Sequence, residues 1–227
     1  MKKILLIFLI ILSVILFFNK KLIETYSLYK FSNWVEKKVI FEEFKIDYPN
    51  TIIINNLKIL NSNPIYYKTI FEAEILIVKF DIKSLLFSEL VFIHDLKIQN
   101  PKFFLELLVK EIKSDEKAEV IKIIYIDNIG LAKKINENLP EKIWPMKKKD
   151  INFIISKINI NNGKAFIKIS SISKETETSM SNIQFMNVGN EKGYTHYKDT
   201  LKIMLFDIFA RLKDPNLKKI LKKVYNF

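Results

Sequence analysis

The sequence predicts an α+β protein, mainly antiparallel β, with an N-terminal transmembrane helix, a curved antiparallel sheet and C-terminal amphipathic helices. Three observations support this fold class. An apolar run stands near the N-terminus, apolar and polar residues alternate with period two through residues 50–110, and apolar residues recur at helical spacing from Tyr197 onward. A chain of 227 residues is long enough for one domain and an anchor.

The N-terminal run has the composition of a membrane anchor. Residues 4–18 contain one polar residue, Ser13, and lysine pairs flank the run. As a helix the run is about 22 Å long. It is therefore short for a bilayer core of roughly 30 Å, and it also suits the apolar region of a signal peptide. Alanine and glycine are absent before Ala73, so no small-residue cleavage site follows and a retained anchor is favoured. The expected anchor residues are Ile4, Leu5, Leu6, Ile7, Phe8, Leu9, Ile10, Ile11, Leu12, Val14, Ile15, Leu16, Phe17 and Phe18.

Patterning divides the chain into four regions. They are a transmembrane anchor at 1–21, a juxtamembrane helix and first strand region at 22–47, an antiparallel β-rich domain at 48–195, and C-terminal amphipathic helices at 196–227.

Eight strands are expected in the body of the protein. Asn100-Pro101 is predicted to form a turn, and Asn161-Asn162-Gly163 has the composition of a hairpin turn. A short helix is expected at 127–139 and a basic loop at 140–150. The strands are expected at 51–60, 70–81, 89–99, 102–108, 120–126, 150–160, 164–170 and 179–188.

One pattern recurs along these strands: Ile, two residues, an apolar residue, one residue, an apolar residue, one residue, Asn. It predicts a repeated strand whose end is marked by a turn-forming asparagine. The alternative is an unrepeated meandering sheet in a chain rich in Ile and Asn. The five copies are Ile54–Asn61, Ile93–Asn100, Ile121–Asn128, Ile155–Asn162 and Ile183–Asn190.

Several strand centres are apolar on both faces, so both faces of the sheet need cover. Helices are expected on one face. The other face is covered by folded-back sheet, by a protein partner, or by lipid. The residues that we expect to face lipid in the last case are Ile53, Ile75, Ile77, Phe92 and Ile154.

The tail ends in a small basic amphipathic helix at 216–227, after a break at Asp214-Pro215. Two interpretations are open. The helix docks its apolar stripe on the domain, or it lies on an anionic membrane surface. In the second case the membrane-facing lysines are Lys218, Lys219, Lys222 and Lys223.

The net charge of +12 says little about a nucleic-acid partner. Arg211 is the single arginine, and Lys, Ile, Asn and Phe, all with A/T-rich codons, make up 113 of the residues. Arginine is the usual residue for bidentate base and phosphate contacts. We therefore expect no nucleic-acid partner.

Residues for catalysis are scarce. The absence of cysteine excludes disulfides, thiolate metal sites and a cysteine nucleophile. His94 lies mid-strand and His196 precedes the tail helix, while Glu72 and Glu74, which share a strand face, have the character of a solvated edge. We expect no enzyme, cofactor or metal. A tethered hydrolase, the remote alternative, requires a cleft that brings a histidine beside a carboxylate.

The order of these features resembles the AsmA-like family of Gram-negative envelope proteins, related to TamB. The resemblance rests on Val78–Leu86 (VKFDIKSLL), on the turns Asn63-Pro64 and Asn100-Pro101, and on the ending Asn187–Thr195 before a terminal helix. The chain corresponds to a short, single-module member, and the family has no catalytic residues to carry over.

The resemblance implies a single-pass inner-membrane protein with its main domain in the periplasm. Lysine counts around the anchor favour a cytoplasmic domain instead. We follow the resemblance and expect a non-enzymatic envelope protein that handles phospholipid, or supports outer-membrane biogenesis, through an apolar sheet face. The alternative is a membrane-tethered scaffold or assembly subunit that binds a protein partner. The expected partners are the bilayer, phospholipid and envelope proteins.

Overall fold

The computed structural model describes residues 21, 24–25, 28–29, 31–32, 37–88, 90–113, 121–128, 152–172, 174–190 and 193–225. The predicted anchor residues 4–18 and the predicted basic loop at 140–150 lie outside this part, as does nearly all of the predicted helix at 127–139. In the described residues, no helix has the length and apolar character needed to cross a membrane.

The described chain forms a twelve-stranded sheet with a few helices, so the α+β class is confirmed. Hydrogen-bonded neighbours follow the order β10-β9-β6-β4-β5-β8-β11-β12; β3 lies beside β4 and carries β1 and β2, and β7 pairs with β6. The strands are β1 (Val39–Ile40), β2 (Glu43–Asp47), β3 (Thr51–Leu60), β4 (Thr69–Phe80), β5 (Leu90–Gln99), β6 (Lys102–Lys113), β7 (Ile121–Asp127), β8 (Asn152–Asn161), β9 (Lys164–Ile169), β10 (Thr176–Ser179), β11 (Ile183–Gly189) and β12 (Thr195–His196).

Most strand pairs are antiparallel, as predicted, but the sheet is mixed, so the expectation of a wholly antiparallel sheet is wrong. β5 runs parallel to β8, β6 parallel to β9, and β11 parallel to β12. Alternation along a strand does not report the direction of its neighbour. Doubly apolar centres are typical of parallel strands, and two of them, Val91–Ile93 and Phe153–Ile155, do pair in parallel with each other. The other two, Ile52–Ile54 and Ile75–Val78, lie on β3 and β4, whose pairs are all antiparallel.

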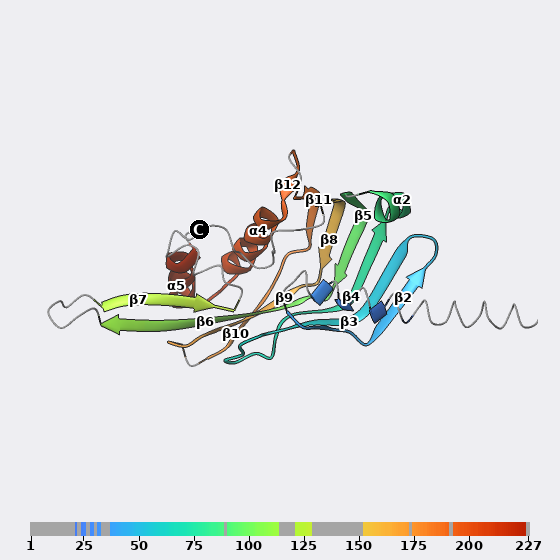
Figure 1. The fold of residues 1–227 in the computed structure, drawn as a ribbon. Coiled ribbons are helices and arrows are strands. Elements are labelled where there is room, and N and C mark those ends of the chain that lie inside the picture. Colours follow the sequence, from blue (N-terminus) through green and yellow to red (C-terminus); the bar gives the residue numbers. More distant parts are fainter. Residues whose placement is uncertain are drawn as a thin grey trace, which may run out of the picture.

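A row of residues that lie side by side on neighbouring strands crosses the sheet, and several strands end at this row. Residue 90 pairs with 152 and residue 102 with 164, an offset of 62 in both cases, so β6 continues the line of β5 as β9 continues that of β8. In the same way, β1 and β2 form one line along β3, and β10 and β11 form one line along β9 and β8. We call the residues of this row, Asn56, Glu74, Asn100 and Asn162, the bend row. Figure 1 shows β5 and β8 standing at an angle to β6 and β9.

Asparagines in left-handed backbone geometry form the bend. The φ angles are 53° at Asn56, 50° at Asn100 and 57° at Asn162, a region that asparagine tolerates better than most residues. The predicted hairpin at Asn161-Asn162-Gly163 is therefore wrong, because β8 and β9 do not pair and only Asn162 of the three residues has a positive φ. A two-residue hairpin turn of the favoured type needs two such residues. Asn100-Pro101 is likewise a bend.

The recurring pattern marks strand ends, as predicted. β3, β5, β7, β8 and β11 each end at the residue before the pattern's asparagine. Asn100 and Asn162 bend the chain, and the other three asparagines bond to main-chain groups: Asn61 Nδ2 donates to Tyr67 O (3.3 Å), Asn128 Oδ1 accepts from Glu106 N (3.0 Å), and Asn190 Oδ1 accepts from Phe153 N (2.8 Å). The copies that end at Asn100 and Asn162 lie side by side in register.

The tail forms two helices, α4 (Tyr197–Ala210) and α5 (Pro215–Tyr225), which confirms that prediction. Figure 1 shows both on the inside of the bent sheet. They enclose one core cluster with β6 and β9, whose fully buried members include Leu107, Ile169, Phe209 and Leu221.

A third helix, α2 (Ile82–Phe87), was not predicted. Asp81 caps it by accepting a hydrogen bond from Ser84 N at 2.6 Å, and Ser84 Oγ accepts another from Phe92 N at 2.9 Å, which ties the helix to β5. The Asp and Ser of the Val78–Leu86 segment therefore have a structural role. Six residues are too few to show helical periodicity.

Candidate functional site

The sheet has two faces of different chemistry. The helix-side face, which carries α4 and α5, has an apolar surface on the part of the sheet that β2, β3, β4, β5, β8 and β11 form. Strand pairing places two rows of apolar side chains across six neighbouring strand lines, and we call them the apolar rows. The first row is Phe44, Ile54, Leu76, Ile98, Ile160 and Ile183; the second is Ile46, Ile52, Val78, Leu96, Ile158 and Phe185.

The opposite, outer face is mixed along the corresponding row. Its members are Lys45, Ile53, Ile77, Lys97, Asn159 and Gln184. Asp95 pairs with Lys97 at 3.4 Å and accepts a hydrogen bond from Asn159 at 2.9 Å on this face. Polar side chains therefore break its apolar surface into small groups.

The five residues expected to face lipid lie on this outer face in two separate groups. Ile53 and Ile77 are direct partners and Ile75 is two residues further along β4, so these three form one small partly buried group. Phe92 pairs with Ile154 beyond it; Phe92 packs edge-on against His94 and Ile154 is buried. The larger continuous apolar surface lies on the helix-side face, which sequence reasoning did not select.

The missed signal lies in the recurring pattern itself. In the copies Ile93–Asn100 and Ile155–Asn162, the two residues after Ile disturb the strand alternation, and the pairing of β4 with β5 shifts there. As a result Ile93, Leu96 and Ile98 all pack with the same core cluster as Ile155 and Ile158. In these two copies the apolar positions of the pattern all lie on the helix-side face.

The described helices cover only part of the apolar rows. Their side chains pack mainly over β6 and β9, and α4 reaches the cluster around Ile158 and Ile160 through Met204. No described side chain of α4 or α5 belongs to the cluster built on Leu57, Ala73 and Leu76, which packs instead with Phe31 and Phe41 among others. Most members of the apolar rows on β3, β4 and β5 are only partly buried.

The four predicted membrane-facing lysines lie on α5, whose apolar stripe is already occupied. Leu217, Leu221, Val224 and Tyr225 are buried against the domain. The structure therefore has the docked arrangement of α5, and insertion of its apolar stripe into a bilayer is excluded while α5 stays docked. Lys219, Lys222 and Lys223 are exposed, and Lys218 Nζ donates to Ala210 O at 3.0 Å.

A polar cluster fastens α4 to the bend. Ser181, between β10 and β11, donates from its backbone N (2.9 Å) and its hydroxyl (2.8 Å) to the carboxylate of Asp207, which also pairs with Arg211 at 3.2 Å. Partial burial alone would raise the pKa of Asp207, but these hydrogen bonds and the guanidinium outweigh it and lower the pKa. Sequence reasoning missed this cluster, although Arg211 is the single arginine of the chain.

A buried carboxylate organises the outer face below the bend. Glu106, 2% exposed, accepts hydrogen bonds from the backbone N of Ile65 (3.1 Å), Tyr66 (2.8 Å) and Tyr67. These bonds hold the β3–β4 loop over β6. Because the carboxylate receives several donors, its position in an apolar strand is stabilised.

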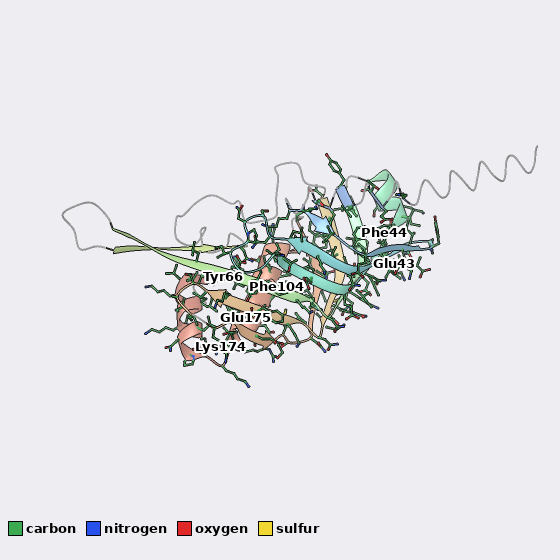
Figure 2. The ribbon with its side chains drawn as sticks, turned by 90° about the horizontal axis from the view of Figure 1, so that it is seen from below. Glu43, Phe44, Tyr66, Phe104, Lys174 and Glu175 are labelled. Atoms are coloured by element: carbon green, nitrogen blue, oxygen red, sulfur yellow. The ribbon has the colours of Figure 1, made fainter. Side chains whose placement is uncertain are left out.

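Aromatic residues complete this outer-face cluster. The Tyr67 ring packs on Phe104, and Phe104 stacks on Phe166 at 5.1 Å. The Tyr67 hydroxyl donates to Glu175 at 2.8 Å; burial and then this bond raise the pKa of Tyr67. Figure 2 shows Tyr66, Phe104 and Glu175 in one region, away from Glu43 and Phe44. The groups bond to one another, as in a structural support for the loop.

The histidines and acidic pairs stand in separate environments. His94 is exposed on β5, and His196 ends β12 directly before α4. Glu72 accepts from Thr69 at 3.1 Å, whereas Glu74 accepts from Asn100 at 2.6 Å, so the two carboxylates have different partners. Within the described ranges, no group of three His, Cys, Asp or Glu residues is arranged to hold a metal ion.

Compared with protein-family models, with curated proteins and with solved structures, the chain matches none. The likeness to the AsmA-like family therefore stays a prediction from the sequence.

Proposed function

We propose that this chain is a membrane-anchored, non-enzymatic envelope protein of the AsmA-like type that holds lipid acyl chains on the helix-side face of its sheet. The observation that carries the proposal is the pair of apolar rows. They run without a polar residue across six strand lines, while the same strands on the outer face carry Lys45, Lys97, Asn159 and Gln184.

The part of the rows that the described residues leave only partly buried lies on β3, β4 and β5. Three strand lines at about 4.8 Å spacing extend roughly 10 Å. One leaflet of a bilayer core is about 15 Å thick, so an acyl chain that lies along the rows would contact these strands over much of its length. Burial of methylene groups stabilises such binding by about 0.8 kcal/mol each. The proposed location is the inner membrane, with the domain in the periplasm and the anchor at residues 1–21.

Lipid co-purification tests the proposal. The full chain is purified in detergent, washed extensively and extracted with organic solvent for mass spectrometry. We expect phospholipid at a stoichiometry that falls when Leu96→Lys places a charge in the second row. The matched control is Ile77→Lys, which makes the same kind of change on the outer face of the adjacent strand.

Equal lipid content in both variants would contradict the proposal. The alternative, a tethered scaffold that covers the same rows with a protein partner, gives a different result. A single protein that crosslinks to the helix-side face, with no lipid lost in Leu96→Lys, would support the scaffold.

A further inference from the structure

We infer that the outward surface of the α4–α5 pair is a second membrane contact, which docks on a bilayer containing anionic lipid. This contact goes beyond the proposed lipid-holding function and does not depend on it. It uses the lysines of α5 together with an exposed apolar stripe of α4, while the apolar stripe of α5 stays in the domain core.

The first observation is uncompensated charge. Residues 197–225 contain eight basic and three acidic residues, a net charge of +5. Five ion pairs occur among the described residues: Lys45–Glu43, Lys97–Asp95, Lys164–Glu177, Lys202–Asp199 and, just after α4, Arg211–Asp207. In the described part of the chain none of the α5 lysines has an acidic partner, and α5 contains no acidic residue.

Helix stability does not account for this charge. Lys222 and Lys223 lie in the last turn of α5, where a positive charge complements the helix dipole. Lys218 and Lys219 lie in the first half of the helix, where the dipole gives them no such benefit. Three exposed lysines, with the partly exposed Lys218 beside them, on one helix of eleven residues therefore suggest an external anionic surface.

The second observation is an exposed apolar stripe next to these lysines. Ile203 and Phe206 are 50% and 37% exposed, and with the exposed Ala210 they follow helical spacing on one face of α4. Lys218 Nζ bonds to the carbonyl of Ala210 at 3.0 Å, so the lysine side of α5 adjoins the end of this stripe. Apolar side chains bordered by lysines match a membrane interface, where lysines meet headgroups and apolar groups enter the acyl boundary.

The absence of cysteine from the chain allows a direct test with single labels. The full chain is reconstituted into vesicles of phosphatidylcholine alone or with about 30% phosphatidylglycerol, which supplies the anionic headgroups. A fluorophore at Asn216→Cys reports on the exposed side of α5 without removing a lysine. The matched control is Gln184→Cys, exposed on the outer face of the sheet. A lipid-borne quencher measures proximity to the bilayer.

We expect quenching at position 216 to be roughly twofold stronger in anionic vesicles and to disappear in about 0.5 M salt, because salt screens exposed charges. The control label should respond to neither change. Replacing Lys218, Lys219, Lys222 and Lys223 by Gln should abolish the effect, and Ile203→Ser with Phe206→Ser should weaken it, with unchanged circular dichroism in both cases. Equal quenching at 216 in the two vesicle types, or equal responses at 216 and 184, would overturn the inference.

Discussion

Single asparagines determine where this sheet bends. Asn56, Asn100 and Asn162 each hold a left-handed backbone conformation that would place a Cβ-branched or bulky side chain under strain. Hydrogen bonds extend the row sideways: Asn56 Nδ2 donates to Glu42 at 2.6 Å, and Asn100 Nδ2 donates to Glu74 at 2.6 Å. The chain's high asparagine content therefore has a structural use at these positions.

Asn162 gives the cleanest test of this role, because it donates a hydrogen bond to Asn182 Oδ1 (2.9 Å) from its backbone N, and any non-proline variant keeps this bond. Asn162→Ala should lower the free energy of unfolding by about 1–2 kcal/mol, since a left-handed conformation costs roughly that much for L-residues. Asn162→Gly should be less destabilising, because glycine adopts positive φ freely. Urea unfolding of the two variants measures the difference, and equal stability would contradict the role of the backbone angle.

Asp207 makes part of the stability dependent on pH. Its pKa is lower in the folded state than its ordinary value of 3.8, so the folded state favours the charged form. The stabilisation is present above the unfolded pKa and is lost as the pH falls through the lowered folded pKa. Asp207→Asn should therefore be less stable than the natural chain at pH 6, and the gap should be smaller at a pH below the lowered folded pKa of Asp207. A gap of the same size at both pH values would show that the ionisation of Asp207 plays no part.

At the scale of elements, the sequence predicted most strands and both tail helices, because period-two and helical spacing report local structure directly. It did not predict how the strands pair. Asn-Gly at 162–163 is a hairpin composition, yet β8 and β9 continue in one line because their partners are β5 and β6. Strands whose paired residues are 62 positions apart in the sequence show no sign of that pairing in their local sequence pattern, except for the doubly apolar runs of β5 and β8.

The strands that form the candidate site could likewise be predicted from the sequence, but the face of the sheet on which the site lies could not. The apolar strand centres identified the right strands, but a strand apolar on both faces does not say which face joins a continuous surface. Only the register of Ile54, Leu76, Ile98 and Ile160 across four strands shows that their face is uninterrupted. The bends then keep the later residues of β6 and β9, such as Leu105 and Ile167, on this same side.

Substitutions on the buried side and on the exposed side of α5 test whether this helix is docked on the domain. Leu221 is fully buried and Lys222, the next residue, is exposed. Leu221→Ala should cost about 2–5 kcal/mol of unfolding free energy, the range for a buried leucine. Lys222→Ala should change it by less than about 0.5 kcal/mol. Thermal and urea unfolding compare the two, and a neutral Leu221→Ala would mean that α5 is not docked in solution.

At the scale of the whole molecule, the bend row divides the helix-side face of the sheet into two parts that are covered differently. Below the bend row, the helix-side face is closed by α4 and α5 around Phe209 and Leu221. Above it, the apolar rows on β3, β4 and β5 are only partly buried by described residues. On the outer face of the same strands, polar side chains such as Lys45, Lys97 and Asn159 break the apolar surface into small groups. This division supports a protein that presents one apolar surface from an otherwise closed domain.

Site-specific photocrosslinking at neighbouring residues of β5 tests this account most directly. Ile98 lies in the first apolar row and Lys97 lies on the outer face, so a photoreactive amino acid at 98 or 97 of the full chain probes opposite faces of one strand. In membranes, we predict a phospholipid adduct at position 98 and none at position 97, read by mass spectrometry of the isolated protein. Lipid adducts of equal yield at both positions, or at 97 alone, would contradict the assignment of the helix-side face as the lipid-holding surface.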